Sequence, residues 1–188
     1  MGKLTICMYG AASERIDRQY ITEVEKLGEE IGKRNHKLIY GAGASGLMGA
    51  CARGVQRVGG TVIGVAPRFM SAFEDINNDC TEFITTETMA DRKQIMEDNA
   101  DAFLVAPGGI GTFDEFFQLL TLIELGRKEA PVICYNINGF YDNLIKVLDE
   151  CIEKGFIHEN VRTMFEVCDN EKEALDIIEN ALKNKSEK

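Results

Sequence analysis

The chain has 188 residues, of which 45% are hydrophobic and 28% charged, and its formal net charge is −10. This length and hydrophobic content suit a single α/β domain over residues 1–188. The negative charge argues against nucleic acid or an anionic membrane as a partner. The apolar runs are too short to cross a bilayer and no signal-peptide pattern precedes the first expected strand, so we expect a cytoplasmic protein.

The cysteines and histidines give no sign of a metal site. Six cysteines are scattered along the chain, without a Cys-x-x-Cys pair and without a cluster around either of the two histidines. This spacing predicts reduced thiols and no bound metal or other cofactor. The Gly-x-Ser-x-Gly motif of α/β-hydrolases is absent as well.

Apolar runs alternate with amphipathic patterns along the whole chain. Strands are expected at residues 4–9, 37–40, 61–66, 83–85, 102–105, 132–135 and 164–167. Helices are expected at residues 14–34 with Ser13 as the cap, after the glycine loop 41–49 to about residue 59, and at residues 87–99, 113–125, 140–154 and 171–183. Residues 67–79 look irregular, and the polar tail 184–188 is expected to fray.

The order of these elements predicts the fold class. Strands and helices take turns, and the strand segments are apolar throughout rather than alternating between apolar and polar residues. A sheet of that kind is parallel and covered on both faces. The sequence therefore predicts a Rossmann-like doubly wound α/β domain, in which ligands bind at the carboxyl ends of the strands.

The charges are distributed unevenly. No Asp or Glu occurs between residues 31 and 73, and this segment contains Lys33, Arg34, Lys37, Arg53, Arg57 and Arg68. The segment could admit a small anion to the glycine loop that it contains. The alternative is that these cations are ordinary solvated residues of helices and loops.

Three glycines follow the expected strand 102–105 and precede an expected helix. Gly108, Gly109 and Gly111 lack a Cβ atom, so the backbone can turn sharply and approach a ligand closely. The first amides of a helix are free donors, and the helix dipole favours an anion beside them. The sequence therefore predicts an anion site at the start of helix 113–125.

Glu115 has two possible interpretations. Thr112 and Glu115 have the spacing of a capping box, in which the Glu side chain bonds back to the cap residue at the start of a helix. In the other interpretation, Glu115 places a carboxylate at the mouth of the glycine loop for chemistry. The sequence alone leaves both open.

A second glycine loop follows the expected strand 37–40. Gly41, Gly43 and Gly46 match the dinucleotide-binding pattern Gly-x-Gly-x-x-Gly. That pattern requires an acidic residue about 20 positions later for the ribose, and the acid-free segment continues to Phe73. Because the Gly-Lys-Ser/Thr of a Walker A motif is also missing, the loop is interpreted as a mononucleotide or phosphate cradle rather than an NAD(P) site.

Two further patterns point to a site and to an interface. Arg92 and Lys93 follow Met89 at an expected helix start, where they could hold a carboxylate or phosphate or simply be an exposed basic pair. Helix 113–125 is apolar on nearly all sides. Such a helix is covered on both sides, either by a second subunit or by a neighbouring helix of the same chain.

Three blocks of the sequence together resemble a known family. Residues 40–49, 89–93 and 107–115 read Tyr-Gly-Ala-Gly-Ala-Ser-Gly-Leu-Met-Gly, Met-Ala-Asp-Arg-Lys and Pro-Gly-Gly-Ile-Gly-Thr-Phe-Asp-Glu. In this order and spacing they resemble the signature blocks of the LONELY GUY family, cytokinin riboside 5′-monophosphate phosphoribohydrolases that are often mislabelled as lysine decarboxylases. The sequence has no motif for a pyridoxal phosphate Schiff base that would support the decarboxylase label.

The resemblance implies a Rossmann-like homodimer that cleaves the N-glycosidic bond of AMP-type nucleotides. The family's essential Arg and Glu fall on Arg92 and Glu115. The implied nucleotide contacts fall on Gly43, Ser45, Gly46, Met89, Lys93, Gly108, Gly109, Ile110, Gly111, Thr112, Asp114 and Thr121. Where the family usually has Cys-Gly-Ser-Ser in its first loop, this chain has Tyr-Gly-Ala-Ala at residues 9–12.

The function expected from these observations is hydrolysis of a nucleoside 5′-monophosphate, AMP or an N6-substituted cytokinin nucleotide, to free base and ribose 5-phosphate. Glu115 would stabilise or trap the oxocarbenium-like centre, and Arg92 would orient Glu115 or hold the ribose. No metal or nicotinamide is expected to take part. The alternative is a nucleotide or cofactor carrier that binds in the same pocket without chemistry.

Overall fold

The computed structural model describes residues 2–186. The strands are β1 (Thr5–Tyr9), β2 (Lys37–Tyr40), β3 (Thr61–Pro67), β4 (Glu82–Thr86), β5 (Ala102–Val105), β6 (Val132–Tyr135) and β7 (Glu166–Cys168). The α-helices are α1 (Arg18–Lys33), α2 (Gly46–Arg57), α3 (Met89–Asp98), α4 (Ile110–Glu124), α5 (Asp142–Glu153) and α6 (Glu171–Ser186), and 3-10 turns occur at η1 (Arg68–Ala72), η2 (Ile137–Gly139) and η3 (Glu159–Thr163).

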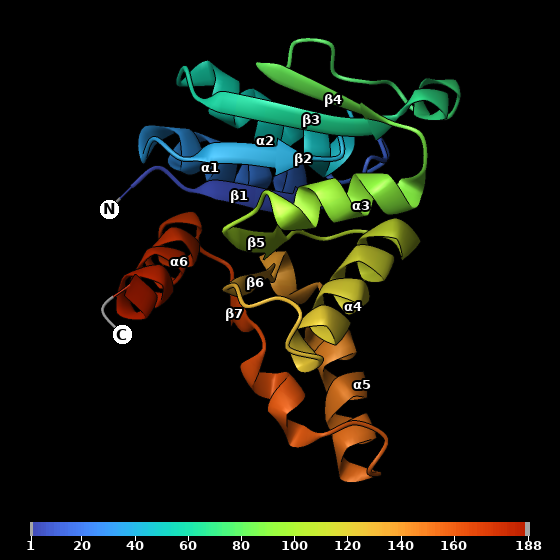
Figure 1. Cartoon of the computed structure of the whole chain (residues 1–188), viewed down its shortest axis with the longest axis vertical. Helices are drawn as coiled ribbons and strands as arrows, with labels where there is room; N and C mark the ends of the chain where they lie inside the picture. Colours follow the sequence, from blue (N-terminus) through green and yellow to red (C-terminus); the bar gives the residue numbers. More distant parts are fainter. Residues whose placement is uncertain (1, 187–188) are drawn as a thin grey trace.

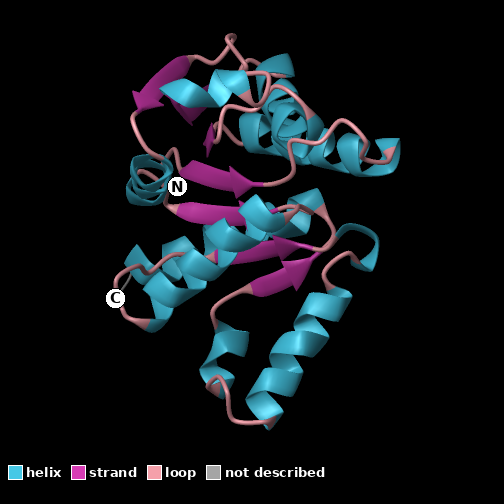
Figure 2. Cartoon of the chain, turned by 90° about the vertical axis from the view of Figure 1, so that its right-hand side faces the viewer, coloured by secondary structure: helices cyan, strands magenta, loops and turns pink. Residues whose placement is uncertain are grey.

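The seven strands form one parallel sheet in the order β4-β3-β2-β1-β5-β6-β7 (Figure 1). Three helices, α1, α2 and α6, pack on one face, and α3, α4 and α5 pack on the other. Figure 2 shows the helices around the strand layer, with α5 and the turn after it reaching beyond the last strands. The predicted doubly wound α/β fold is confirmed.

Successive residues of the central strand β1 belong to opposite halves of the core. Ile6 and Met8 are buried against α1, α2 and α6, whereas Cys7 and Tyr9 are buried against α3 and α4. Both faces of the strand are therefore covered, which is why its sequence is apolar at every position rather than at every second one.

The chain reverses its direction of sheet growth at β1. From β1 it adds β2, β3 and β4 on one side, and then returns to add β5, β6 and β7 on the other. The helices that follow β1 and β5 leave to opposite faces of the sheet, so the loops at the carboxyl ends of these two strands diverge. A crevice at such a topological switch point is where open parallel sheets bind ligands.

The start of α1 differs from the prediction because another side chain caps the helix. Helix α1 begins at Arg18 instead of residue 14, since the carboxylate of Asp17 accepts a hydrogen bond from the amide of Gln19 at 2.8 Å and makes Asp17 the cap in place of Ser13.

At the other end of the chain, α6 continues to Ser186, past its predicted end at residue 183. An ion pair between Lys185 and Glu129, 3.1 Å long, lies in this extension. Residues 187–188 of the tail that was expected to fray lie outside the described residues.

Candidate active site

A cleft of about 350 Å3 lies at the carboxyl ends of β1 and β5, on the face of the sheet covered by α3 and α4. It is lined by Gly10, Ala11, Ala12, Ser13, Met48, Met70, Glu74, Met89, Arg92, Gly109, Gly111, Thr112 and Glu115. Of the residues predicted for the site, the structure therefore brings together Met89, Arg92, Gly109, Gly111, Thr112 and Glu115. These residues come from α3 and from the glycine loop that leads into α4.

The start of α4 differs from the prediction, and this excludes the capping interpretation of Glu115. The helix begins at Ile110 with Gly109 as its cap, and its first backbone bond runs from the amide of Phe113 to the carbonyl of Gly109 at 3.0 Å. Thr112 is thus inside the first turn and is not the cap, so the predicted capping box is wrong. Glu115 lies beyond the first turn, where a side chain no longer serves a helix cap.

Gly108 is required by the close packing of the loop against α4. A Cβ atom at this position would lie 2.1 Å from the hydroxyl oxygen of Thr112, which is buried. The backbone at Gly108 can therefore lie directly on the Thr112 side chain, and the amides of the first turn of α4 are left pointing out of the helix end. Such amides have no partner within the helix, and together with the helix dipole they favour an anion.

Arg92 is held in the cleft by the start of α3. Thr88 caps this helix and forms a reciprocal capping box with Asp91, with the Asp91 amide donating to the Thr88 hydroxyl at 3.0 Å. One turn of helix places Arg92 over the ends of the strands, where its Nε donates to the carbonyl of Val65 at 3.2 Å. A Cβ atom at residue 41 would lie 1.7 Å from the guanidinium, so Gly41 gives the Arg92 side chain its place.

Arg92 and Glu115 form a buried ion pair. Nη1 of Arg92 donates to Oε1 of Glu115 at 3.3 Å, and the two residues are 5% and 7% exposed. Burial raises the pKa of Glu115 to about 7, although the positive charge of Arg92 acts in the opposite direction. Desolvation outweighs this attraction because the carboxylate has lost nearly all of its water. The carboxyl group can therefore exchange a proton near neutral pH.

The sequence analysis missed a second carboxyl group in the cleft, Glu74. It follows η1 in the segment that was expected to be irregular, and burial raises its pKa while Arg92 lowers it. The sequence did contain a signal, because Glu74 is the first acidic residue after the acid-free segment 31–73. The first acid after such a segment is a candidate for a specific role.

Thioethers provide most of the apolar lining. Met48, Met70 and Met89 line the cleft together with the small side chains of Ala11 and Ala12. Methionine side chains are flexible and polarisable and make favourable contacts with aromatic rings. The cleft thus combines the amino end of α4, two carboxyl groups and an adaptable apolar wall.

Other residues predicted for the site do not line this cleft. The Nζ of Lys93 pairs with the carboxylate of Asp114 at 2.9 Å. The hydroxyl of Ser45 donates to Glu14 at 2.9 Å, and Gly43 forms an isolated bridge with Ile76.

Four more of the predicted residues also lie elsewhere. Gly46 begins α2 with a φ of 59°, and Gly108 lines a neighbouring cleft. Ile110 is 85% exposed, and Thr121 lies on the exposed side of α4. Roles in binding for these residues stay predictions.

The cations of the acid-free segment do not line the cleft either. Arg34 pairs with Glu30 and Asp176, at 2.8 Å and 2.6 Å. Arg57 pairs with Glu25 and Glu29 of α1 at 2.6 Å and 2.7 Å. The acids that pair with these cations come from outside the segment, which explains how the segment can lack its own. In the cleft, the positive charge comes from Arg92.

Residues 2–186 contain neither a cluster of metal ligands nor a helix that could span a membrane. No group of three or more His, Cys, Asp or Glu side chains in this part of the chain could hold a metal ion. Across the same residues, every helix is too short or too polar to cross a bilayer.

The raised pKa of Glu115 predicts a particular pH dependence of stability. Between about pH 4.5 and 7 the folded protein binds a proton that the unfolded chain has lost, so folding stability from this group falls as the pH rises through that window. Glu115→Gln removes the titration. The difference in free energy of unfolding between Glu115→Gln and wild type should therefore shift by about 3 kcal/mol in favour of the variant when the pH rises from about 4.5 to about 8. Urea denaturation measures both free energies.

The matched control is Glu124→Gln, which removes an exposed carboxyl group from the same helix without touching the buried pair. A difference between Glu115→Gln and wild type that stays constant across the window would contradict a raised pKa, whatever its size. A constant offset alone would report only the loss of the contact with Arg92.

Several known proteins are similar to this chain in sequence. Residues 48–178 match the family model described as possible lysine decarboxylase. The cytokinin riboside 5′-monophosphate phosphoribohydrolase of Mycobacterium tuberculosis is 36% identical over 93% of this chain and 92% of its own length. The enzyme of that name called LOG2 in Arabidopsis thaliana is 33% identical over 93% of this chain and 82% of its own.

Solved structures agree on the fold. The molybdenum cofactor binding protein of Rippkaea orientalis superposes with a TM-score of 0.72 at 17% identity, over 97% of this chain and 99% of the other. The Moco carrier protein of Chlamydomonas reinhardtii superposes with a TM-score of 0.72 at 18% identity, over 97% of this chain and 99% of the other. At such identities the likeness concerns the fold alone, whereas the sequence matches over most of both chains show that this protein belongs to the LONELY GUY family.

Proposed function

We propose that this protein hydrolyses the N-glycosidic bond of a nucleoside 5′-monophosphate to free base and ribose 5-phosphate. The observation that carries the proposal is the buried Arg92–Glu115 pair beside the open amino end of α4. The names of the relatives, which specify cytokinin riboside 5′-monophosphates, support AMP or an N6-substituted AMP as the substrate.

The 5′-phosphate is assigned to the amino end of α4. The backbone of Gly109, Gly111 and Thr112 lines the cleft there, and free amides and the helix dipole together favour a dianion. No cation from the acid-free segment lines the cleft, so backbone donors carry this role. The base then lies among Met48, Met70 and Met89.

Glu115 is assigned to the sugar. Cleavage of an N-glycosidic bond builds positive charge on the ribose, as in glycoside hydrolysis, and a carboxylate can stabilise that charge or trap it as a nucleophile. Burial among apolar groups strengthens this interaction because little water screens it. Arg92, 3.3 Å away, orients the carboxylate and favours its ionised form against the desolvation that raises its pKa.

Glu74 is assigned to the leaving base. The departing purine must take up a proton, and burial raises the pKa of Glu74, which favours the protonated form that a general acid needs. The pair of carboxyl groups then divides the work, with Glu115 at the sugar and Glu74 at the base. This is the usual arrangement of glycoside hydrolysis, in which one carboxylic acid protonates the leaving group.

Substitution of the buried pair tests the reaction. Glu115→Gln preserves shape but cannot supply negative charge, so turnover of AMP should fall by about 10²- to 10³-fold with free base measured by chromatography. The turnover of Arg92→Ala should fall by a similar factor, and the double variant should lose little more turnover, because both residues act on one transition state. Glu124→Gln is the control. Binding of AMP with no base released by the wild-type protein would instead establish the carrier alternative.

Glu74→Gln tests the second carboxyl group separately. Turnover of AMP should fall by about 10²-fold because the leaving base is no longer protonated. With p-nitrophenyl riboside 5′-phosphate, whose leaving group needs no proton, the same variant should keep near wild-type turnover. Equal losses on the two substrates would show that Glu74 binds or positions the nucleotide and is not the acid.

We also propose that two copies pair through the outer side of α4, over the predicted segment 113–125. Ile110, Phe117 and Leu125 are 85%, 40% and 66% exposed, and their spacing of two helical turns puts them on one stripe. A stripe of large apolar side chains beside a cleft marks an interaction surface. The same surface on both copies makes a closed twofold dimer. A cytoplasmic location is likewise a proposal.

Light scattering tests the dimer. The wild-type protein should have twice the mass of the chain at micromolar concentration, and Phe117→Glu should shift it to the monomer by placing a charge in the interface. Val147→Glu, on an equally exposed apolar residue of α5, should stay dimeric. A wild-type protein that is monomeric and hydrolyses AMP would refute the proposal.

A further inference from the structure

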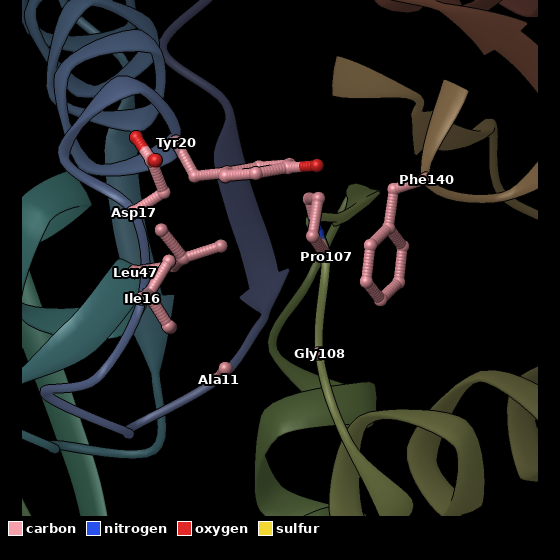
Figure 3. A pocket seen from close by; sticks show the side chains of 8 residues that line it. All are labelled: Ala11, Ile16, Asp17, Tyr20, Leu47, Pro107, Gly108 and Phe140. Atoms are coloured by element: carbon pink, nitrogen blue, oxygen red, sulfur yellow. The ribbon is translucent and has the colours of Figure 1, made fainter. Parts of the chain in front are cut away.

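A second cleft, of about 290 Å3, lies next to the first on the other face of the sheet. Its walls come from the loop after β1, from α1, from the start of α2 and from the loop after β6 (Figure 3). The aromatic rings of Tyr20 and Phe140 and the pyrrolidine ring of Pro107 line it, and Ile16 and Leu47 complete the apolar lining.

A narrow backbone ridge separates the two clefts. The amide of Ala11 donates to the carbonyl of Pro107 at 3.2 Å, which joins the loops after β1 and β5. Ala11 lines both clefts, whereas Gly108 lines the second and Gly109 the first. The second cleft is therefore a separate space that shares its dividing wall with the proposed reaction site.

The walls of the second cleft are held in place before any ligand binds. The rings of Tyr20 and Phe140 meet edge to face with centroids 6.4 Å apart. The side-chain amide Nε2 of Gln19 donates to Oδ1 of Asn138 at 3.2 Å, and Asn138 has a φ of 53°. A left-handed residue of this kind persists only where its surroundings determine it, and such positions cluster at ligand clamps. The hydroxyl of Tyr141 fixes the same loop by donating to Ala106 at 2.7 Å.

The charges of this cleft disfavour a phosphate. Asp17 is its one charged residue, and no Lys or Arg is among the residues that line it. One oxygen of the Asp17 carboxylate accepts from the amide of Gln19, which leaves acceptor positions on the other oxygen. The chemistry that fits is an uncharged planar ring, stacked on aromatic side chains, with an N–H group directed at a carboxylate.

We propose that this cleft is a second ligand site that binds a free purine base. The choice of a purine rests on the proposed function, because that reaction releases such a base on the other side of the Ala11–Pro107 ridge. The ring faces of Tyr20 and Phe140 give surfaces on which the base can stack, Pro107 adds an apolar contact, and Asp17 accepts from its N–H groups. The negative charge of Asp17 disfavours the nucleotide and leaves this cleft to an uncharged base.

A fluorescent reporter tests the site directly. The chain contains no Trp, so Phe140→Trp introduces a single indole at the cleft. Titration with adenine should change its fluorescence saturably. The matched reporter Phe156→Trp, at an exposed position outside the cleft, should show no saturable change. Calorimetry on the unsubstituted chain and on Phe140→Ala gives a second measurement, and loss of the ring should weaken adenine binding about tenfold.

Two further variants, made in the reporter protein, identify the cleft that binds. Asp17→Asn keeps a good helix cap but removes the charge, and it should weaken adenine about fivefold. Met89→Ala, in the first cleft, should change adenine affinity less than twofold. A tenfold loss with Met89→Ala would assign the signal to the first cleft and overturn the proposal. So would the absence of saturable binding, or a signal that follows protein concentration and reports pairing of two chains. These titrations involve no turnover, so a protein that fails to hydrolyse AMP leaves them unaffected.

Discussion

The rest of the site depends on one buried ion pair, Arg92 with Glu115. The two side chains belong to different helices, α3 and α4, and meet over the ends of the central strands. Placing charges there is unfavourable unless each is paired and hydrogen-bonded, and the carboxylate is only partly compensated, which is why its pKa is raised. The buried carboxyl group lowers the stability of the fold, and it can respond to charge on a bound molecule. Groups with pKa values shifted in this way are typical of functional sites.

The pair can exist because the backbone around it makes room. Without a side chain at Gly41, the guanidinium of Arg92 lies directly against the end of β2. The pattern of three glycines that resembles a dinucleotide fingerprint therefore has, at its first position, a packing role toward an arginine. Its second and third positions, Gly43 and Gly46, shape the turn into α2 outside the cleft. The sequence pattern identifies the three glycines, whereas the side chain that packs on each of them decides its role.

The reversal of the sheet at β1 gives the molecule two clefts rather than one. Loops from β1 and β5 meet in a ridge closed by the bond from Ala11 to Pro107, and helices leave this ridge toward both faces. The first cleft has carboxyl groups, a helix end and thioethers, and the second has aromatic rings and a single carboxylate. Their opposite chemistry follows from the elements that line them, since α3 and α4 form one side and α1, α2 and the loop after β6 form the other.

The sequence by itself determined the fold class, the bounds of strands β2 and β5, the family and the identity of Arg92 and Glu115 as a pair worth testing, because apolar periodicity and short motifs are local properties. It placed the start of α4 three residues too late, so that Thr112 looked like a cap, and it missed Glu74. Both depend on contacts between distant segments. The loop before α4 packs on Thr112 through Gly108, and η1 returns across the sheet to bring Glu74 near Arg92. Which residues share a cleft, and how far burial moves a pKa, were decided only by the tertiary structure, because burial is a property of the packed chain and not of any segment.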